Sequence, residues 1–326
     1  MTTVCVTGAT GYIGSWLVRS LLSKEYLVNA TTRDINKGLE IFGDCDGLKL
    51  FRGDLSEEGS FDEAVKGCVC VFHVAASMEF GITAAENIEE YVQSNVLEPA
   101  IRGTINVLQS CSRAKTVKRV IFTSSISTIT GKDDNGNWRS VVDESSTISL
   151  DRVWKDKPNG WVYALSKLLT EEKAFEFAKE NGIDLVSIIP PTVAGPFLTP
   201  TVPASLQVLL SPVTGDPKLY AILLAVHSRL GSIPLVHIED ICNAHIFLMD
   251  ATKAKGRYVC VAGSCSLPQI ASLIDGRGDE EIHESKASLV ISSKKLTDLG
   301  FEFKFSVRDI VKDTVSCYVE CGFLKS

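Results

Sequence analysis

The fold is decided by the stretch Thr7-Gly8-Ala9-Thr10-Gly11-Tyr12-Ile13-Gly14, which has the spacing Gly-x-x-Gly-x-x-Gly. The stretch directly follows a short β-branched run and opens a helical pattern, so its glycines stand where a strand turns into a helix. Glycines permit a tight turn there and let a pyrophosphate approach the N–H groups of the helix N-terminus, where the helix dipole also favours negative charge. The flanking elements therefore favour a dinucleotide-binding turn over an ordinary tight turn.

The composition fits a globular protein with a large core, built as one large domain or two closely joined ones. The chain has 326 residues, of which 45% are hydrophobic and 22% are charged, which is ample for a buried core. The formal net charge of −7 argues against broad nucleic-acid binding, which needs a basic footprint. The longest apolar run, residues 219–226, is far below the roughly 18 residues needed to cross a membrane. We expect no nucleic-acid partner and no membrane insertion.

The amino terminus and the cysteines indicate a cytoplasmic protein. Residues 1–6 run straight into a strand pattern, without the basic and apolar regions of a secretory signal. The 10 cysteines are scattered along the chain, and reduced thiols in a cytosolic protein explain them. Cys68 and Cys70 flank one strand residue, so alternation would put both on the same face. A redox pair is the alternative role for these two thiols.

The first two-thirds of the chain alternate short β-branched runs with longer helical patterns, which is typical of stacked βαβ units and a parallel sheet. Several runs are nearly all apolar, as strands buried on both faces are. We expect helices over residues 13–24, 86–113 and 163–181, the last of which ends at a helix stop, Asn181-Gly182. The predicted strands are Thr3–Thr7, Leu27–Thr32, Leu48–Arg52, Val69–His73, Arg119–Thr123 and Asp184–Ile189.

This order predicts an α/β fold, a doubly wound parallel Rossmann sheet with a smaller, discontinuous substrate-binding lobe. Beyond the last predicted strand, prolines and glycines interrupt any long regular element, and then a strand-to-helix unit returns. We assign residues 1–191 and about 231–254 to the nucleotide-binding sheet domain. Residues from about 192 to 230 and from 255 to 326 would form the substrate-binding lobe.

The end of the second predicted strand is where the nucleotide is chosen. A carboxylate there binds the ribose 2′-hydroxyl of NAD, whereas an arginine accepts the 2′-phosphate of NADP. Thr32 stands 18 residues past Gly14, with Arg33 beside it and Lys37 shortly after. This charge favours NADPH. Asp34 leaves an alternative open, since it could serve as the NAD-type acid or pair with Arg33.

Tyr163 and Lys167 are the candidate proton-delivery pair. Four residues apart at the start of a helix, they lie on one face. A lysine cation beside a phenol favours the phenolate, which moves a pKa of about 10 towards the working pH and makes Tyr163 a usable general acid. Ser125 follows the fifth predicted strand at its carboxyl end, where ligands bind in open α/β sheets. Its hydroxyl can donate to the same carbonyl oxygen, and no metal ligand is assigned.

Five motifs occur together along the chain: Thr7–Gly14, Asp54-Leu55, His73-Val74-Ala75-Ala76, Thr123-Ser124-Ser125 and Tyr163-x-x-x-Lys167. Together they resemble the extended short-chain dehydrogenases/reductases. The subgroup is similar to the plant dihydroflavonol, anthocyanidin, vestitone and cinnamoyl-CoA reductases, and most of all to the anthocyanidin reductases. Segments such as residues 236–245 and 292–301 carry the likeness into the second lobe, so it covers essentially the whole chain.

The resemblance implies a role for each position that matches the family's pattern. Ser125, Tyr163 and Lys167 would be catalytic, and hydride would pass from NADPH to a carbonyl or its conjugated equivalent. Lys167 would also bind the nicotinamide ribose. The implied cofactor contacts are Gly8, Ala9, Thr10, Gly11, Tyr12, Ile13 and Gly14 for the pyrophosphate, Arg33 and Lys37 for the 2′-phosphate, Asp54 and Leu55 for the adenine, and Val74, Ala75, Ala76, Tyr163, Lys167, Pro190, Val193 and Ser205 for the rest of the nucleotide.

Substrate contacts are expected at Ser77, Met78 and Thr130, beside Tyr163. Dihydroflavonol reductases characteristically carry an asparagine five residues after the catalytic serine. Here that residue is Thr130, whose single hydroxyl cannot give the same two contacts. The run Asn159-Gly160-Trp161-Val162-Tyr163 differs from the pattern of cinnamoyl-CoA reductases and argues against a CoA thioester. The expected substrate is therefore an aromatic, flavonoid-like carbonyl compound.

Other functions remain open at this point. The same machinery could reduce a ketone or aldehyde of another specialised metabolite, or oxidise an alcohol in the reverse direction. A non-catalytic NADP-binding protein on this fold typically loses the tyrosine or the lysine, and an epimerase would need a nucleotide-sugar pocket. We expect His237 to be a structural histidine bonded to backbone rather than a catalytic group, and the chain to be a monomer or weak dimer.

Overall fold

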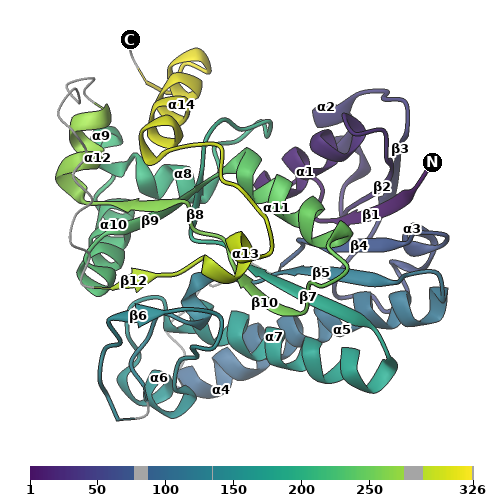
Figure 1. Ribbon diagram of the computed structural model, residues 1–326, viewed down its shortest axis with the longest axis horizontal. Helices are drawn as coiled ribbons and strands as arrows, with labels where there is room; N and C mark the ends of the chain where they lie inside the picture. Colours follow the sequence, from purple (N-terminus) through teal and green to yellow (C-terminus); the bar gives the residue numbers. More distant parts are fainter. Residues whose placement is uncertain (77–86, 134, 275–288, 325–326) are drawn as a thin grey trace.

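Seven strands form the central sheet (Figure 1): β1 (Thr3–Thr7), β2 (Leu27–Thr32), β3 (Leu48–Arg52), β4 (Cys70–His73), β5 (Arg119–Thr123), β7 (Asp184–Ile189) and β10 (Gly256–Val259). All of them pair in parallel, in the order β10-β7-β5-β4-β1-β2-β3. The computed structural model describes residues 1–76, 87–133, 135–274 and 289–324. The predicted α/β, doubly wound parallel sheet is confirmed. All predicted strands have the predicted bounds except β4, which begins one residue later.

Helices cover both faces of this sheet (Figure 1). On one face lie α1 (Tyr12–Leu22), α2 (Ile35–Phe42) and α11 (Ile238–Asp250), and on the other α3 (Asp62–Val65), α5 (Glu98–Ala114) and α7 (Trp161–Asn181). Strand β1 illustrates the packing, because Val4 and Val6 join Leu17 in the core under α1, while Cys5 joins Val107 under α5. Apolar side chains on both faces explain why such strands are buried throughout.

The predicted helix over residues 86–113 has three parts. It consists of α4 (Ile88–Val92), a π-helical turn η1 (Gln93–Leu97), and α5, which begins at Glu98. Pro99 stands in the first turn of α5, where its missing N–H group costs little. The wider turn inserts an extra residue into the helical repeat, which the hydrophobic pattern alone does not reveal.

The second lobe is built on a three-stranded sheet of β8 (Thr192–Ala194), β9 (Ile233–His237) and β11 (Gly263–Cys265), with β9 in the centre. Its core gathers Leu206, Leu209, Leu223 and Ile310. Its helices lie together in Figure 1 and are α8 (Ala204–Leu209), α9 (Ser211–Thr214), α10 (Pro217–Leu230), α12 (Leu267–Ile274) and α14 (Val307–Glu320).

Several short elements complete the structure. They are η2 (Ile126–Thr128), β6 (Val141–Val142), α6 (Leu150–Asp156), β12 (Val290–Ile291) and α13 (Lys294–Asp298), with β6 and β12 pairing in parallel. Of the helices that the structure describes, none is both long enough and apolar enough to cross a membrane.

Two segments depart from the predicted division of the chain. Strand β9, within the stretch 231–254 assigned to the sheet domain, pairs with β8 and β11 in the smaller sheet. Helix α11, from the same stretch, does join the core under α1. Strand β10, within the stretch 255–326 assigned to the second lobe, instead forms the edge of the central sheet beside β7. Strand pairing is set by tertiary contacts, so hydrophobic runs alone do not say which sheet takes them.

The expectation for Cys68 and Cys70 is wrong in its geometry. Cys68 precedes β4 and lies in the core under α5, whereas Cys70 begins β4 and lies in the core under α1. Both are free thiols. Burial raises the pKa of Cys68 to about 11, so this thiol is protonated and a poor nucleophile at neutral pH.

Candidate active site

A cavity of about 950 Å³ opens at the carboxyl ends of the central strands. The strand order reverses between β1 and β4, because β2 and β3 extend to one side and β5, β7 and β10 to the other. Helices α1 and α5, which follow β1 and β4 in the chain, therefore leave on opposite faces of the sheet and open a crevice between them. Ligands bind at such a switch point in open α/β sheets.

The glycine turn forms one wall of the cavity. Gly8 has φ of +68°, and a Cβ on it would lie 2.8 Å from the Cα of Ala75. A Cβ on Gly14 would run into the carbonyl oxygen of Gly8. Gly11 is the N-cap of α1 and gives no side-chain cap. The first N–H groups of α1 are therefore open to an anion, as a pyrophosphate site requires.

Nearly all the predicted cofactor residues line this cavity. The exception is Ala9, which is fully buried in the core under α1 and whose N–H donates to the carbonyl of Thr31 at 3.0 Å. Its side chain leaves the turn towards the sheet and does not line the cavity, so the expected contact of Ala9 with the pyrophosphate stays a prediction. The predicted residues that do line the cavity are Gly8, Thr10, Gly11, Tyr12, Ile13, Gly14, Arg33, Lys37, Asp54, Leu55, Val74, Ala75, Ala76, Pro190, Val193 and Ser205, together with Ser125, Tyr163 and Lys167.

The structure gives Asp34 a structural role, where the sequence had left open whether it binds a ribose or pairs with Arg33. It is the N-cap of α2, and its carboxylate accepts a hydrogen bond of 2.9 Å from the backbone N–H of Asn36. Arg33 and Lys37 line the cavity on either side of it. Asp54 also lines the cavity, and its pKa is lowered by hydrogen bonds from the N–H and hydroxyl of Ser56 and by the charge of Arg33. The end of β2 thus presents two cations to the cavity.

The three predicted catalytic residues come together where β5 ends and α7 begins. The side chains of Ser125 and Tyr163 lie next to each other, so that Ser125 acts on the pKa of the phenol. Ser125 is the N-cap of η2, and its Oγ accepts from the N–H of Ser127 at 3.2 Å. The Nζ of Lys167, one turn along α7 from Tyr163, donates to the carbonyl of Thr123 at 3.1 Å. Strand β5 thereby fixes both Ser125 and the lysine.

Burial decides the protonation of this group. It raises the pKa of Tyr163 above its usual value of 10.0, against the opposing effect of Ser125. It lowers the pKa of Lys167 to about 8, against the opposing charge of Glu171. The expected shift of the phenol towards the working pH is therefore wrong for the protein alone, because loss of hydration disfavours both charged forms. Tyr163 is a neutral phenol, which is the form that donates a proton.

Of the predicted substrate contacts that the structure describes, Tyr163 lines the cavity and Thr130 does not. Ser77 and Met78 lie outside the described residues. Thr130 is only 2% exposed, its hydroxyl donates to the carbonyl of Ile126 at 2.8 Å, and it does not line the described cavity. The turn that follows Ser125 directs this side chain into the protein, so its hydroxyl already has a partner.

The sequence prediction missed a third wall of the cavity. Asn95, Pro99 and Arg102 line it from η1 and α5. Their spacing of four and then three residues places them on one face of a helix, which is the signal that would have found them. Arg102 adds a cation to this cavity besides Arg33, Lys37 and Lys167.

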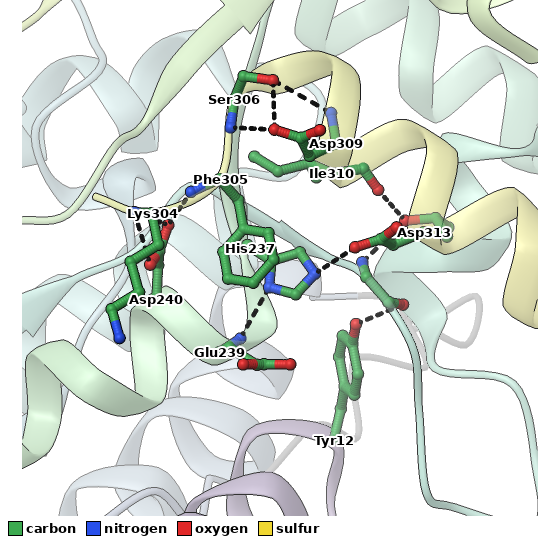
Figure 2. Close-up of polar contacts among 12 residues, drawn as sticks. Tyr12, His237, Glu239, Asp240, Lys304, Phe305, Ser306, Asp309, Ile310 and Asp313 are labelled. Atoms are coloured by element: carbon green, nitrogen blue, oxygen red, sulfur yellow. Dashed lines mark hydrogen bonds and ion pairs between the residues drawn. The ribbon is translucent and has the colours of Figure 1, made fainter.

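His237 lies outside the cavity lining and has the structural role predicted for it (Figure 2). It is fully buried, and its Nδ1 accepts from the backbone N–H of Glu239 at 3.2 Å. Its ring stacks on Phe305 with 3.7 Å between centroids, and its Nε2 lies 3.5 Å from a carboxylate oxygen of Asp313. Burial lowers the pKa of His237 to about 4, so the imidazole is neutral at pH 7.

Figure 2 also shows how the glycine turn is attached to the second lobe. The hydroxyl of Tyr12, the first residue of α1, donates to the carbonyl of Gly195 at 2.9 Å. The N–H of Gly195 donates in turn to the hydroxyl of Thr314 on α14 at 2.7 Å. Gly195 has φ of +123°, and a Cβ there would lie 2.8 Å from the Nε2 of His237. Only a glycine fits between the histidine and the turn.

Known proteins resemble the chain along almost its whole length. Dihydroflavonol 4-reductase of Callistephus chinensis is 41% identical over 336 aligned positions, which cover 99% of this chain and 88% of that protein. The (2S)-flavan-3-ol-forming anthocyanidin reductase of Vitis vinifera is 38% identical over 336 positions, with 99% and 97% covered. The crystal structure of vestitone reductase from alfalfa superimposes with a TM-score of 0.80 at 33% identity, covering 99% of this chain and 100% of that one.

A family model describes most of the same length. The model of the NAD dependent epimerase/dehydratase family matches residues 4–262, which include the glycine turn, the end of β5 and the first turn of α7. The matched range also contains Ser125, Tyr163 and Lys167, which line the cavity at the strand-order reversal. The chain therefore belongs to the NAD dependent epimerase/dehydratase family, as a reductase of the extended short-chain dehydrogenase/reductase type.

Proposed function

We propose that the protein is an NADPH-dependent reductase of an aromatic, flavonoid-like carbonyl compound. The observation that carries the proposal is the neighbouring pair Ser125 and Tyr163, with Lys167 one turn along the helix of Tyr163, in the lining of a cavity that a glycine turn also lines. Relatives named for flavonoid substrates, at 38–41% identity over nearly the full length, support the substrate class.

The choice of NADPH rests on charge. Arg33 and Lys37 line the cavity at the end of β2, and a 2′-phosphate placed there would meet two cations. The carboxylate of Asp34 caps α2 through the N–H of Asn36, and Asp34 does not line the cavity, whereas an NAD enzyme needs its carboxylate at the ribose 2′-hydroxyl. The glycines that a Cβ would block, Gly8 and Gly14, fit the close approach of a pyrophosphate. When bound, NADPH supplies the hydride.

The protein's own residues supply the proton. Tyr163, held as a neutral phenol by its burial, donates its proton to the carbonyl oxygen of the substrate as negative charge develops there. The hydroxyl of Ser125 donates a second hydrogen bond that stabilises the same charge. Lys167 stands on the same face of α7 and stabilises the tyrosinate that remains. Protons from water then restore the phenol.

We place the substrate between this group and the second lobe. Thr199, Val202, Pro203 and Ala204 line the cavity and give it an apolar side that suits an aromatic ring. In this proposal residues 1–191 hold the cofactor, while the segments around 192–230 and 255–326 contribute the substrate side, except β10, which belongs to the central sheet.

The test measures NADPH consumption by the purified protein with anthocyanidins, dihydroflavonols, isoflavanones and hydroxycinnamoyl-CoA esters, one at a time. We expect turnover with at least one flavonoid class and none with the CoA esters. Activity on unrelated ketones or aldehydes alone would replace the substrate class and keep the reductase. NADPH binding without turnover on any carbonyl compound would leave a non-catalytic nucleotide-binding protein.

A further inference from the structure

An ion pair between a buried glutamate and a partly buried arginine lies next to the proton-delivery group. Glu171 on α7 is 2% exposed, and its Oε2 lies 3.0 Å from the Nη2 of Arg257 on β10. Its Oε1 accepts a hydrogen bond from the hydroxyl of Ser187 on β7, which is fully buried. Arg257 and Ser187 are paired in register on neighbouring strands. The carboxylate thus has both oxygens engaged at the sheet surface that α7 covers.

Arg257 extends this network to the turn that carries Ser125. Its Nη2 also donates to the hydroxyl of Thr128 at 2.8 Å, and that hydroxyl donates to the carbonyl of Ser125 at 2.9 Å. Its Nη1 donates to the carbonyls of Glu144 and Ser146 at 3.2 and 3.0 Å. The planar guanidinium therefore connects the catalytic helix, the Ser125 turn and the 144–146 segment, which a lysine in its place could not do.

Glu171 is also a neighbour of the catalytic lysine. It stands four residues after Lys167 on α7, so the two side chains lie on one face of the helix. Among the described residues, Glu171 on α7 is the charged group that acts on the pKa of Lys167. Lys167 in turn acts on His73 of β4, Tyr163 stands one turn before it on α7, and Arg257 of β10 pairs with Glu171. Of these only Glu171 brings a negative charge close to the ammonium group.

We propose that Glu171 and Arg257 are positioning residues for the reduction, a pair that keeps Lys167 charged through Glu171 and holds the Ser125 turn through Arg257 and Thr128. The inference rests on the proposed roles of Ser125, Tyr163 and Lys167. Because both sides of the proton-delivery group are attached to one network, the hydroxyls of Ser125 and Tyr163 keep their mutual distance when substrate enters. Positioning of this kind contributes to the rate of a step rather than to binding.

Stability alone does not explain the pair. Taking two charges out of water is costly, and apolar side chains of similar volume often stabilise a core as well or better. The apolar alternative would leave the hydroxyl of Thr128 and the carbonyls of Glu144 and Ser146 without the donors that Arg257 gives them. It would also remove the negative charge beside Lys167.

The first test uses Glu171→Gln, which keeps the shape and removes the charge. Loss of the carboxylate leaves Arg257 uncompensated, and both effects disfavour the ammonium form of Lys167. We expect the alkaline limb of the kcat/KM profile to move to lower pH by about half a unit or more. Glu176→Gln is the matched control, because Glu176 is an exposed carboxylate on the same helix, paired with Lys173 at 2.6 Å. The control should leave the limb in place.

A second variant separates charge from geometry. Arg257→Lys keeps the positive charge beside Glu171 but loses the planar guanidinium that donates to Thr128 and to the carbonyls of Glu144 and Ser146. We expect kcat to fall about tenfold or more, the Kd for NADPH to stay within about twofold, and the alkaline limb to stay where it is. A purely structural pair would lower the unfolding temperature of both variants and change neither kcat nor the limb, which would overturn the proposal.

A readout without substrate keeps the two proposals apart. The titration of Lys167 is followed by NMR of protein carrying ε-¹³C-lysine, with Lys167→Arg to assign the signal. Glu171→Gln should lower the midpoint of this titration in the substrate-free protein, and an unchanged midpoint would refute the electrostatic role of Glu171 even in an active enzyme. If the wild-type protein reduces no carbonyl compound while the midpoint does shift, the proposed function fails and the coupling of Glu171 to Lys167 stands.

Discussion

Ser125 lies next to Tyr163 and acts on the pKa of its phenol because the turn after β5 meets the first turn of α7. The two residues come from different elements, so their contact requires the central sheet to be formed and α7 to be packed against it. Burial of this site sets its proton chemistry. It keeps the phenol neutral, lowers the pKa of Lys167 to about 8, and makes proton delivery depend on local partners rather than on water.

Tyr163→Phe should abolish turnover while NADPH still binds. The substitution removes the proton donor and keeps the aromatic ring, so we expect kcat to fall by about 10²- to 10⁴-fold. The Kd for NADPH, measured by quenching of tryptophan fluorescence, should change by no more than about threefold. Tyr26→Phe is the control, because its hydroxyl makes only a long contact of 3.5 Å with Asp250 on the surface. Undiminished turnover of the Tyr163 variant would contradict the acid assignment.

Arg33→Ala should change the preference between the two nicotinamide cofactors. If Arg33 binds the 2′-phosphate, its loss removes a charge-assisted contact worth about 1.5–3 kcal/mol, or about 10- to 100-fold in affinity. The KM for NADPH should therefore rise by this factor while that for NADH stays nearly constant. Arg19→Ala, an exposed arginine on α1 that lies over the ring of Trp16, should leave the ratio unchanged. An equal rise for both cofactors would place Arg33 on a group that they share.

Much of this fold could be predicted because short β-branched and apolar runs mark where its strands begin and end. The bounds of β1, β2 and β5 are those expected from the sequence. The π-helical turn Gln93–Leu97 and the sheet that takes β9 were missed. Both depend on tertiary packing, which overrides the local pattern.

In the candidate site too, some features could be predicted from the sequence and others could not. Backbone-determined positions such as Gly8 and Gly14 could be predicted, since a positive φ or a close approach leaves no other residue. Side-chain direction could not. Ala9 sits inside the glycine turn yet faces the core, and Thr130 follows Ser125 closely yet donates to a backbone carbonyl. The local backbone turn decides where each of these two side chains points, and the residue types alone do not reveal it.

Arg119→Met should destabilise the protein far more than the same change at an exposed arginine. Arg119 is 9% exposed, and besides pairing with Asp184 it donates to the carbonyls of Leu248 and Ala251, where α11 ends. Removing it takes the guanidinium donor from the buried carbonyl of Leu248 and leaves that of Ala251 with the N–H of Ala254 alone, at a cost of about 2–4 kcal/mol of unfolding free energy. Arg113→Met, which breaks an exposed pair with Asp62, should cost no more than about 1 kcal/mol. Urea denaturation measures both, and equal losses would refute the capping role of Arg119.

Acid should destabilise the protein through its buried histidines, one of which is His237. Burial lowers its pKa to about 4, below its unfolded value of about 6.5. Between these two values the unfolded chain binds a proton that the folded protein excludes, so the unfolding free energy falls as the pH is lowered. The slope approaches about 1.4 kcal/mol per pH unit for one such group. The free energy of unfolding of the wild type should therefore drop more steeply from pH 6.5 to 4.5 than that of His237→Gln, with the curves parallel above pH 7.5. Parallel curves throughout would mean that His237 titrates normally in the folded protein, and the contact with Asp313 at 3.5 Å would then be an ion pair rather than a contact of the neutral ring.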